Sequence, residues 1–167
     1  MRSYRKCWVS FLGLIILLLS SSVACGKPGY ATYKNGEMGY AISYPSNWQV
    51  EVSEDGTKCF IVSPTRRASV MIDVAAPMAA RDAANRWIMA LGTAHNELTQ
   101  FENEPRQDFW DWYLSYDWEA EYGLYHGEAY FKQTEKRLYK VDTAAFKNEY
   151  EYHKFNSIIS TFKLLGR

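Results

Sequence analysis

The chain has 167 residues, 47% of them apolar and 23% charged, which is enough for one globular domain and too apolar for a disordered chain. Its 19 basic side chains equal its 19 acidic ones in number. Three of the basic residues, Arg2, Arg5 and Lys6, fall in an N-terminal leader, so the rest of the chain is mildly acidic, with 16 basic against 19 acidic side chains. Because phosphate backbones require a basic surface, nucleic acid is not expected as a partner.

Residues 1–24 have the parts of a secretory signal peptide. The apolar run over residues 7–19 is shorter than the roughly 20 helical residues that cross a bilayer, so it is not expected to span the membrane. It leads to Ser22-Val23-Ala24-Cys25, which resembles a bacterial lipobox, where the leader is removed and the cysteine receives a lipid. The sequence therefore predicts that Cys25 carries fatty acyl groups such as palmitate. Cleavage by ordinary signal peptidase, which would release a secreted protein, is the alternative.

The remaining chain divides into a tether, residues 25–29, and a single domain, residues 30–167. Four extended residues span about 14 Å, so a lipid on Cys25 would hold the domain close to the membrane. Cys7 leaves with the leader and Cys59 is then the one cysteine inside the domain, which excludes an intramolecular disulfide. Cys59 lies in an apolar segment, which predicts a buried structural thiol rather than a nucleophile.

Turn signals divide the first part of the domain into short strands. Asn35-Gly36 and Asp55-Gly56 each predict a hairpin, because these residue types tolerate positive φ. Pro45 interrupts one strand pattern, and residues 64–67 form a turn. Strands are expected over residues 38–44, 48–53, 57–63 and 69–75, which together form a meander.

A helix is expected after this meander, because apolar residues recur at helical spacing over residues 79–91. A similar stripe near the end of the chain predicts a second helix over residues 145–161. Residues 110–120 alternate between apolar and polar side chains and predict the clearest strand of the domain. Further strands are expected over residues 98–102, 124–133 and 137–143. This order of elements indicates an α+β domain with an antiparallel sheet.

Two stretches of the domain resemble the PsbP/Mog1-like superfamily. The first is GYAISYPSNW, residues 39–48, with its tyrosine-proline-x-x-tryptophan entry, and the second runs from Gly127 to the closing serine-x-phenylalanine-lysine at residues 160–163. The resemblance implies an α-β-α sandwich around a twisted antiparallel sheet. It also implies an accessory role, since the superfamily includes photosystem II extrinsic subunits, a nuclear transport cofactor, bacterial lipoproteins and secretion-effector chaperones. A shared fold does not by itself carry a function.

No sequence motif for nucleophilic catalysis, nucleotide binding or zinc hydrolysis occurs, so an enzyme is not expected and no cofactor is predicted. The best candidate metal ligands are His126 and Glu128, about 7 Å apart on one strand face, with His153 as a third. We expect, however, that His126 is an ordinary solvent-facing residue and that the domain holds no metal. Asp117 and Glu119 have the spacing of a glycosidase pair, although alternating acids are also typical of a solvated strand face.

Aromatic side chains supply the candidate binding surface. Six strands make a sheet roughly 25–29 Å wide and one helix covers about 10 Å, so two helices leave part of the sheet exposed. Core packing of the aromatic rings is the alternative. We expect an open groove lined by Tyr113, Tyr125, Tyr130 and Tyr139, with members of the row Trp110, Trp112, Tyr116 and Trp118 at its edge.

The sequence thus leads to the hypothesis of a lipoprotein anchored by its lipid on the extracytoplasmic side of a membrane in the bacterial cell envelope. It would act without catalysis, as a binding or assembly accessory to another envelope protein. A module that binds a small ligand or a metal is the first alternative, and a hydrolase is the second.

Overall fold

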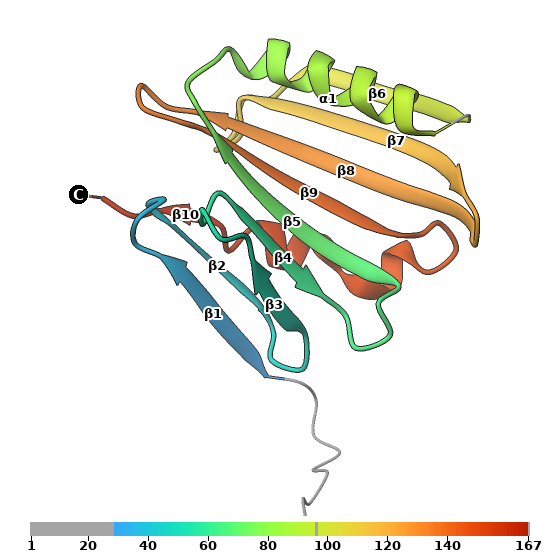
Figure 1. The fold of residues 1–167 in the computed structure, drawn as a ribbon, viewed down its shortest axis with the longest axis horizontal. Helices are drawn as coiled ribbons and strands as arrows, with labels where there is room; N and C mark the ends of the chain where they lie inside the picture. Colours follow the sequence, from blue (N-terminus) through green and yellow to red (C-terminus); the bar gives the residue numbers. More distant parts are fainter. Residues whose placement is uncertain (1–28, 96, 167) are drawn as a thin grey trace, which may run out of the picture.

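The computed structural model describes residues 29–95 and 97–166. The predicted leader, Cys25 and most of the tether lie outside these residues. In the described part, the chain forms two antiparallel sheets and three helical segments (Figure 1). No helix there is long and apolar enough to cross a bilayer. The helical segments are α1 (Ala80–Ala94), the 3-10 helix η1 (Tyr150–His153) and α2 (Phe155–Ile159).

The larger sheet has seven strands, and every neighbouring pair is antiparallel. Short turns connect β3 to β4, β4 to β5, β7 to β8 and β8 to β9, as the turn signals of the sequence predict. In spatial order the strands are β3 (Gln49–Val52), β4 (Lys58–Val62), β5 (Ala68–Ala75), β9 (Leu138–Phe146), β8 (Gly123–Gln133), β7 (Trp112–Ala120) and β6 (Leu98–Pro105).

The smaller sheet consists of β1 (Tyr30–Asn35), β2 (Tyr40–Pro45) and β10 (Lys163–Leu164), in the order β1-β2-β10. The chain leaves this sheet at Pro45, whose ring cannot donate to a ladder. The expected meander is therefore divided between two sheets. Tyr40 and Ile42 of β2 are fully buried, and Tyr40 packs against Tyr139 of the larger sheet, so the two sheets share one core.

Hairpins form at both predicted places, but positive φ at Asn35 and Gly36 was a wrong expectation, since Asn35 ends β1 and neither residue is left-handed. At the first, the left-handed residue is Gly39, with φ +77°, and Asn35 accepts the Met38 N–H at 2.9 Å. At the second, Gly56 has φ +69° and the Asp55 carboxylate accepts hydrogen bonds from neighbouring side chains and backbone. Each turn therefore places a glycine where other residues are strained.

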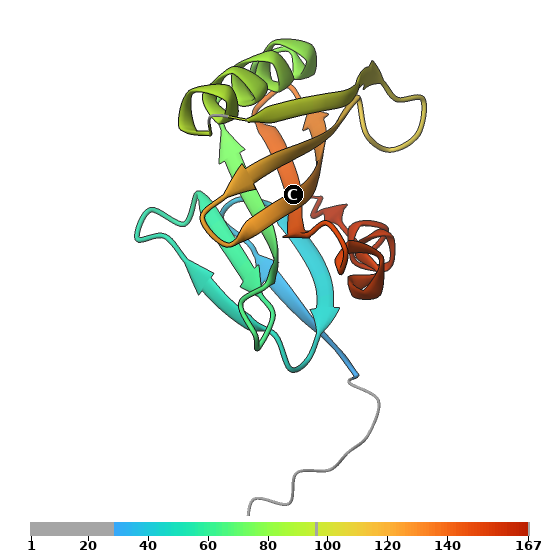
Figure 2. The same ribbon diagram turned by 90° about the vertical axis from the view of Figure 1, so that its right-hand side faces the viewer.

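The seven-stranded sheet is covered differently on its two faces, as Figure 2 shows. Helix α1 packs over β6, β7 and β8 on the face that we call outer, and its position confirms the helix predicted over residues 79–91. On the inner face lie the smaller sheet, η1 and α2. Helices on both sides of an antiparallel sheet confirm the predicted α+β architecture.

Alternation along β7 divides its side chains between the two faces. Trp112, Leu114, Tyr116 and Trp118 pack in the core under α1, as the apolar row predicts. Trp110 does not belong to this row: it precedes β7 and packs in the inner core against Phe162. The polar row is not a solvated face, because Tyr113, Ser115 and Asp117 are all buried on the inner side.

The prediction of one long terminal helix over residues 145–161 is wrong. Ala145 and Phe146 still belong to β9, where Ala145 pairs with Ala68 on one side and His126 on the other. After that strand, Lys154 adopts a left-handed conformation with φ +48° and separates η1 from α2. Strand pairing with residues distant in sequence therefore overrides the local helical stripe.

Candidate functional site

Facing residues of β7 and β8 bring three ionisable side chains together on the inner face. Asp117 lies directly opposite His126 in the ladder, and Glu128 follows two residues later on the same strand face. The His126 Nδ1 atom lies 2.7 Å from Asp117 Oδ1, and its Nε2 atom lies 3.9 Å from Glu128 Oε1. The histidine ring is thus held between two carboxylates.

Other side chains complete this cluster. Lys147 donates to the second oxygen of Asp117 at 2.5 Å, and the Tyr130 hydroxyl donates to Glu128 Oε2 at 2.7 Å. The ring of Tyr150 packs edge-on against His126, with 4.4 Å between ring centroids. We call the set Asp117, His126, Glu128, Tyr130 and Lys147 the inner cluster.

Hydrogen bonds outweigh burial in the inner cluster. Burial alone would lower the pKa of His126, but its contacts with Glu128 and Asp117 raise it above the usual value. Burial alone would raise the pKa of Glu128, but hydrogen bonds from His126, Tyr130 and Tyr113 lower it. Both shifts favour the charged forms of His126 and Glu128.

Solvent reaches one side of the inner cluster. The side chains of His126 and Glu128 are each 18% exposed, whereas that of Asp117 is 6% exposed. Phe101 is the extra residue of a bulge in β6 and is 54% exposed beside His126, with 6.5 Å between ring centroids. A charged cluster therefore opens to solvent next to an exposed aromatic ring.

The chemistry of this arrangement favours binding. The Nε2 atom of His126 faces Glu128 and not a hydroxyl or thiol, so the contacts of the ring do not form a nucleophile-activating triad. Among residues 29–95 and 97–166, no three His, Cys, Asp or Glu side chains are arranged to hold a metal ion. His126 and Glu128 are side by side as predicted, but His153 packs against Trp48 and Phe155 instead of joining them.

The predicted tyrosine groove does not exist. Tyr113, Tyr130 and Tyr139 are only 7%, 7% and 5% exposed and belong to the inner core, while Tyr125 points to the outer face. Tyr125 instead stacks between Trp118 and Phe146, with centroid distances of 5.2 and 4.4 Å. Two helices were expected to leave part of the sheet exposed. In the structure, this aromatic stack and the smaller sheet cover that part.

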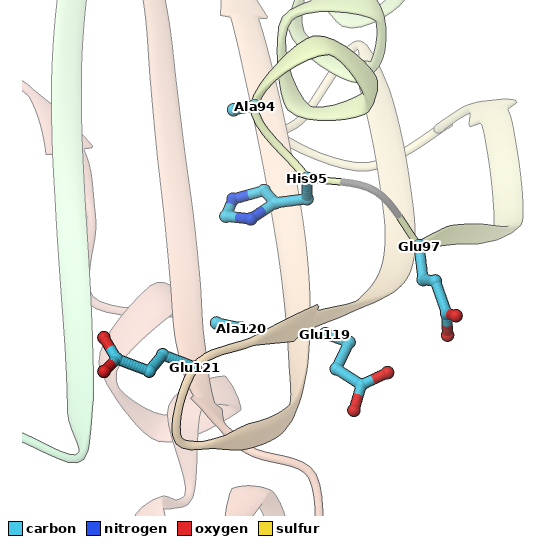
Figure 3. A pocket seen from close by; sticks show the side chains of 6 residues that line it. All are labelled: Ala94, His95, Glu97, Glu119, Ala120 and Glu121. Atoms are coloured by element: carbon cyan, nitrogen blue, oxygen red, sulfur yellow. The ribbon is translucent and has the colours of Figure 1, made fainter.

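The other predicted acids are separated. Asp111 accepts the Lys132 ammonium at 2.9 Å and the Gln133 N–H at 2.6 Å, so it fixes the start of β7 against β8. Glu119 lines a hollow of about 570 Å³ with His95 and Glu121 (Figure 3). In that view, the carboxylates of Glu119 and Glu121 point in different directions. Glu119 and Glu121 therefore do not form a convergent pair of acids.

Cys59 is fully buried and free, as predicted for a structural thiol. Burial raises its pKa to about 11, which leaves the thiol protonated and unreactive at neutral pH. Its register partner in β5 is Ile72, another core residue.

Sequence reasoning missed Lys147 and Tyr150 as members and neighbours of the inner cluster, because both were assigned to a helix. The pairing of Asp117 with His126 was within reach of the sequence. The turn between Ala120 and Gly123 fixes the register of the two strands, and counting back three residues on each side gives this pair.

Known proteins share the structure of this chain, but searches by sequence find no match. No protein-family profile and no curated protein matches the chain. Cyanobacterial PsbP (CyanoP) from Synechocystis matches with a TM-score of 0.67 at 17% identity, over 87% of this chain and 98% of that protein. The Saccharomyces cerevisiae Ran-binding protein Mog1p matches with a TM-score of 0.58 at 9% identity, over 83% and 96%.

A third solved structure is LpqN of Mycobacterium tuberculosis, which is described as involved in cell envelope biogenesis. It matches with a TM-score of 0.54 at 10% identity, over 84% of this chain and 93% of that protein. At such low identities the three matches establish a shared architecture and no shared site. The chain therefore has the PsbP/Mog1-like fold.

Proposed function

We propose that the mature chain is a lipid-anchored domain on the extracytoplasmic side of a bacterial membrane, where it binds another envelope protein without catalysis. The observation that carries the binding role is the inner cluster, a network of ionisable side chains that is open to solvent beside the exposed ring of Phe101. The partner would place a basic side chain at Glu128, whose side chain is 18% exposed and whose Oε1 atom lies 3.9 Å from His126 Nε2.

Two further observations support this role. Exposed Glu102 and Glu104 lie on β6, beside the cluster, and add negative charge that would steer a basic surface toward it. Among proteins of the same fold, one is a Ran-binding protein and one is involved in cell envelope biogenesis. Both descriptions are compatible with a role in protein binding.

The anchor rests on the lipobox-like sequence that ends at Cys25. Replacing Cys25 with Ala is expected to move the protein from the membrane fraction to the soluble fraction and to abolish labelling with a radioactive fatty acid. Cys59→Ala is the matched control and should keep both the label and the location. A Cys25→Ala protein that stays with membranes after a salt wash would rule out the lipid anchor.

The binding surface is tested with a photo-crosslinking amino acid placed at Phe101 in the full-length protein in its own membranes. Met89, which is 71% exposed on α1, is the control position on the outer face. We expect a crosslinked protein from position 101 and none from position 89. Glu128→Gln should abolish this product, while Glu121→Gln should preserve it. A product unchanged by Glu128→Gln, or identical products from both positions, would refute the assignment.

A further inference from the structure

A hollow of about 180 Å³ lies on the outer face, between α1 and strands β5, β9 and β8. Met78, Trp87, Phe131 and Leu138 supply apolar walls. Two basic side chains, Lys140 and Arg86, and one acidic side chain, Asp73, share the same space, so the charged lining carries one net positive charge. An apolar cavity with a few convergent polar groups is the usual form of a small-molecule site.

Lys140 is the polar group of the floor. Its side chain is only 7% exposed, because it stands on β9 between Asp73 of β5 and Phe131 of β8 and is covered by Trp87. The Nζ atom lies 3.1 Å from the centre of the Trp87 ring and 3.6 Å from Asp73 Oδ2. One carboxylate thus lies beside this ammonium, which has three N–H groups and can donate to a second acceptor as well.

A buried ammonium held in this way is costly. Burial lowers the pKa of Lys140 even though Asp142 and Asp73 act in the opposite direction. Asp142 does not accept from it directly in the structure; its Oδ1 atom accepts the Tyr116 hydroxyl at 2.5 Å. An anionic group from outside would accept a further hydrogen bond from the ammonium and add a second opposite charge beside it.

Arg86 stands at the mouth of the hollow. It is exposed, and no carboxylate in the described part of the chain forms an ion pair with it. Since Asp73 and Asp142 accompany Lys140, the guanidinium of Arg86 is the cation that remains for a ligand. Its planar fork is suited to a carboxylate.

We propose that this hollow binds a small organic carboxylate with a short apolar body. The carboxylate would bridge Lys140 and Arg86, and the body would rest on Trp87, Phe131 and Leu138. This site lies on the outer face and does not depend on the proposed protein partner of the inner cluster.

The test is calorimetric titration of the full-length protein in mild detergent with benzoate, phenylacetate and isovalerate. Benzyl alcohol and benzylamine serve as the neutral and cationic counterparts. We expect at least one carboxylate to bind saturably below about 10 mM, and both counterparts to bind at least tenfold more weakly. Absence of saturable binding by all three carboxylates, or equal binding of benzyl alcohol, would overturn the proposal.

Three variants locate the binding in the hollow. Arg86→Ala should weaken carboxylate binding at least tenfold, whereas Arg81→Ala, an exposed arginine on the same helix outside the hollow, should not change it. Ala83→Phe would fill the hollow and should abolish binding. Because Ala83 is 93% buried and its variant could lose the fold, its melting curve is recorded beside that of Arg86→Ala, an exposed position. Wild-type affinity in Arg86→Ala would refute the site.

Discussion

The two faces of the seven-stranded sheet each carry a network of ionisable side chains, and the two networks behave in opposite ways. On the inner face, partners raise the pKa of His126 and lower that of Glu128, so charge is favoured. On the outer face, burial lowers the pKa of Lys140 and raises that of Asp142 to about 6, so charge is disfavoured. The residue types are similar, and the difference is whether hydrogen bonds and ion pairs outweigh burial.

Alternation of side chains along the strands places one network on each face of the same sheet, and the two networks form different kinds of site. In the inner cluster, contacts with Asp117, Glu128 and the Tyr130 hydroxyl outweigh the desolvation of the charged groups. Asp142 is fully enclosed, and the Tyr116 hydroxyl together with the nearby Lys140 repays only part of its desolvation cost. A partly exposed network suits recognition of a charged partner, while a buried and imperfectly paired one suits a small ligand.

The largest expected effect comes from breaking the buried network. Asp142→Ala leaves the Tyr116 hydroxyl without its acceptor and leaves Lys140 with Asp73 as its ion-pair partner, and should lower the free energy of unfolding by about 3–5 kcal/mol. Asp117→Ala on the inner face should cost only about 1–2 kcal/mol, because the Lys147 side chain is 51% exposed and can turn to water. Urea denaturation of both variants measures the two losses. Equal losses of unfolding free energy would show that the two networks do not differ in their contribution to stability.

Packing around Tyr116 gives the next effect. A Cβ atom at Gly127 would lie 2.9 Å from the Tyr116 ring and 3.0 Å from the Thr143 carbonyl oxygen, so Gly127→Ala must displace the ring that binds Asp142. We expect a loss of about 1–3 kcal/mol in urea denaturation. Gly36→Ala is the control, since no atom lies within 4 Å of its Cβ position, and it should change stability little.

The pH dependence of stability separates the two networks. Asp142 has a folded pKa of about 6, above the 3.8 of an ordinary aspartate, so its burial costs nothing below pH 4 and the cost grows as pH rises to 6. His126 has a raised pKa, so its stabilisation is complete below about pH 6.5 and is lost as pH rises through its folded pKa.

These signs are tested by melting curves across pH. The stability of wild type relative to Asp142→Asn should fall between pH 4 and 6, and its stability relative to His126→Gln should fall only above about pH 6.5. Parallel wild-type and variant curves in either range would contradict the corresponding pKa shift.

The smallest effect is expected at the surface. Arg66 and Glu51 form an ion pair of 3.5 Å with side chains 69% and 51% exposed. Glu51→Gln should change the free energy of unfolding by at most about 0.5 kcal/mol, and the change should vanish at 1 M salt. A loss as large as that of Asp117→Ala would show that solvent exposure does not determine how much an ion pair contributes to stability.

Local sequence patterns predicted the strands, the turns and α1, because glycine, proline and alternating side chains act over a few residues. They failed where distant strands decide. Lys140 and Asp142 alternate with apolar neighbours as a solvated strand face does, and only the packing of Trp87 and Tyr116 over them reveals their burial. His126 was placed correctly beside Glu128, but its carboxylate partner Asp117 required the register across the turn.

The bulge at Phe101 has a consequence for how copies of this protein meet. β6 is the last strand of its sheet, and a regular outer strand offers free N–H and C=O groups to which another chain could add. The extra residue breaks that regular spacing, Glu102 and Glu104 repel a second acidic edge, and Pro105 closes the strand without a donor. At the other end β3 has only four residues. Both edge strands of the larger sheet, β6 and β3, are therefore poorly suited to pair with a strand of another molecule, which disfavours edge-to-edge association into fibrils.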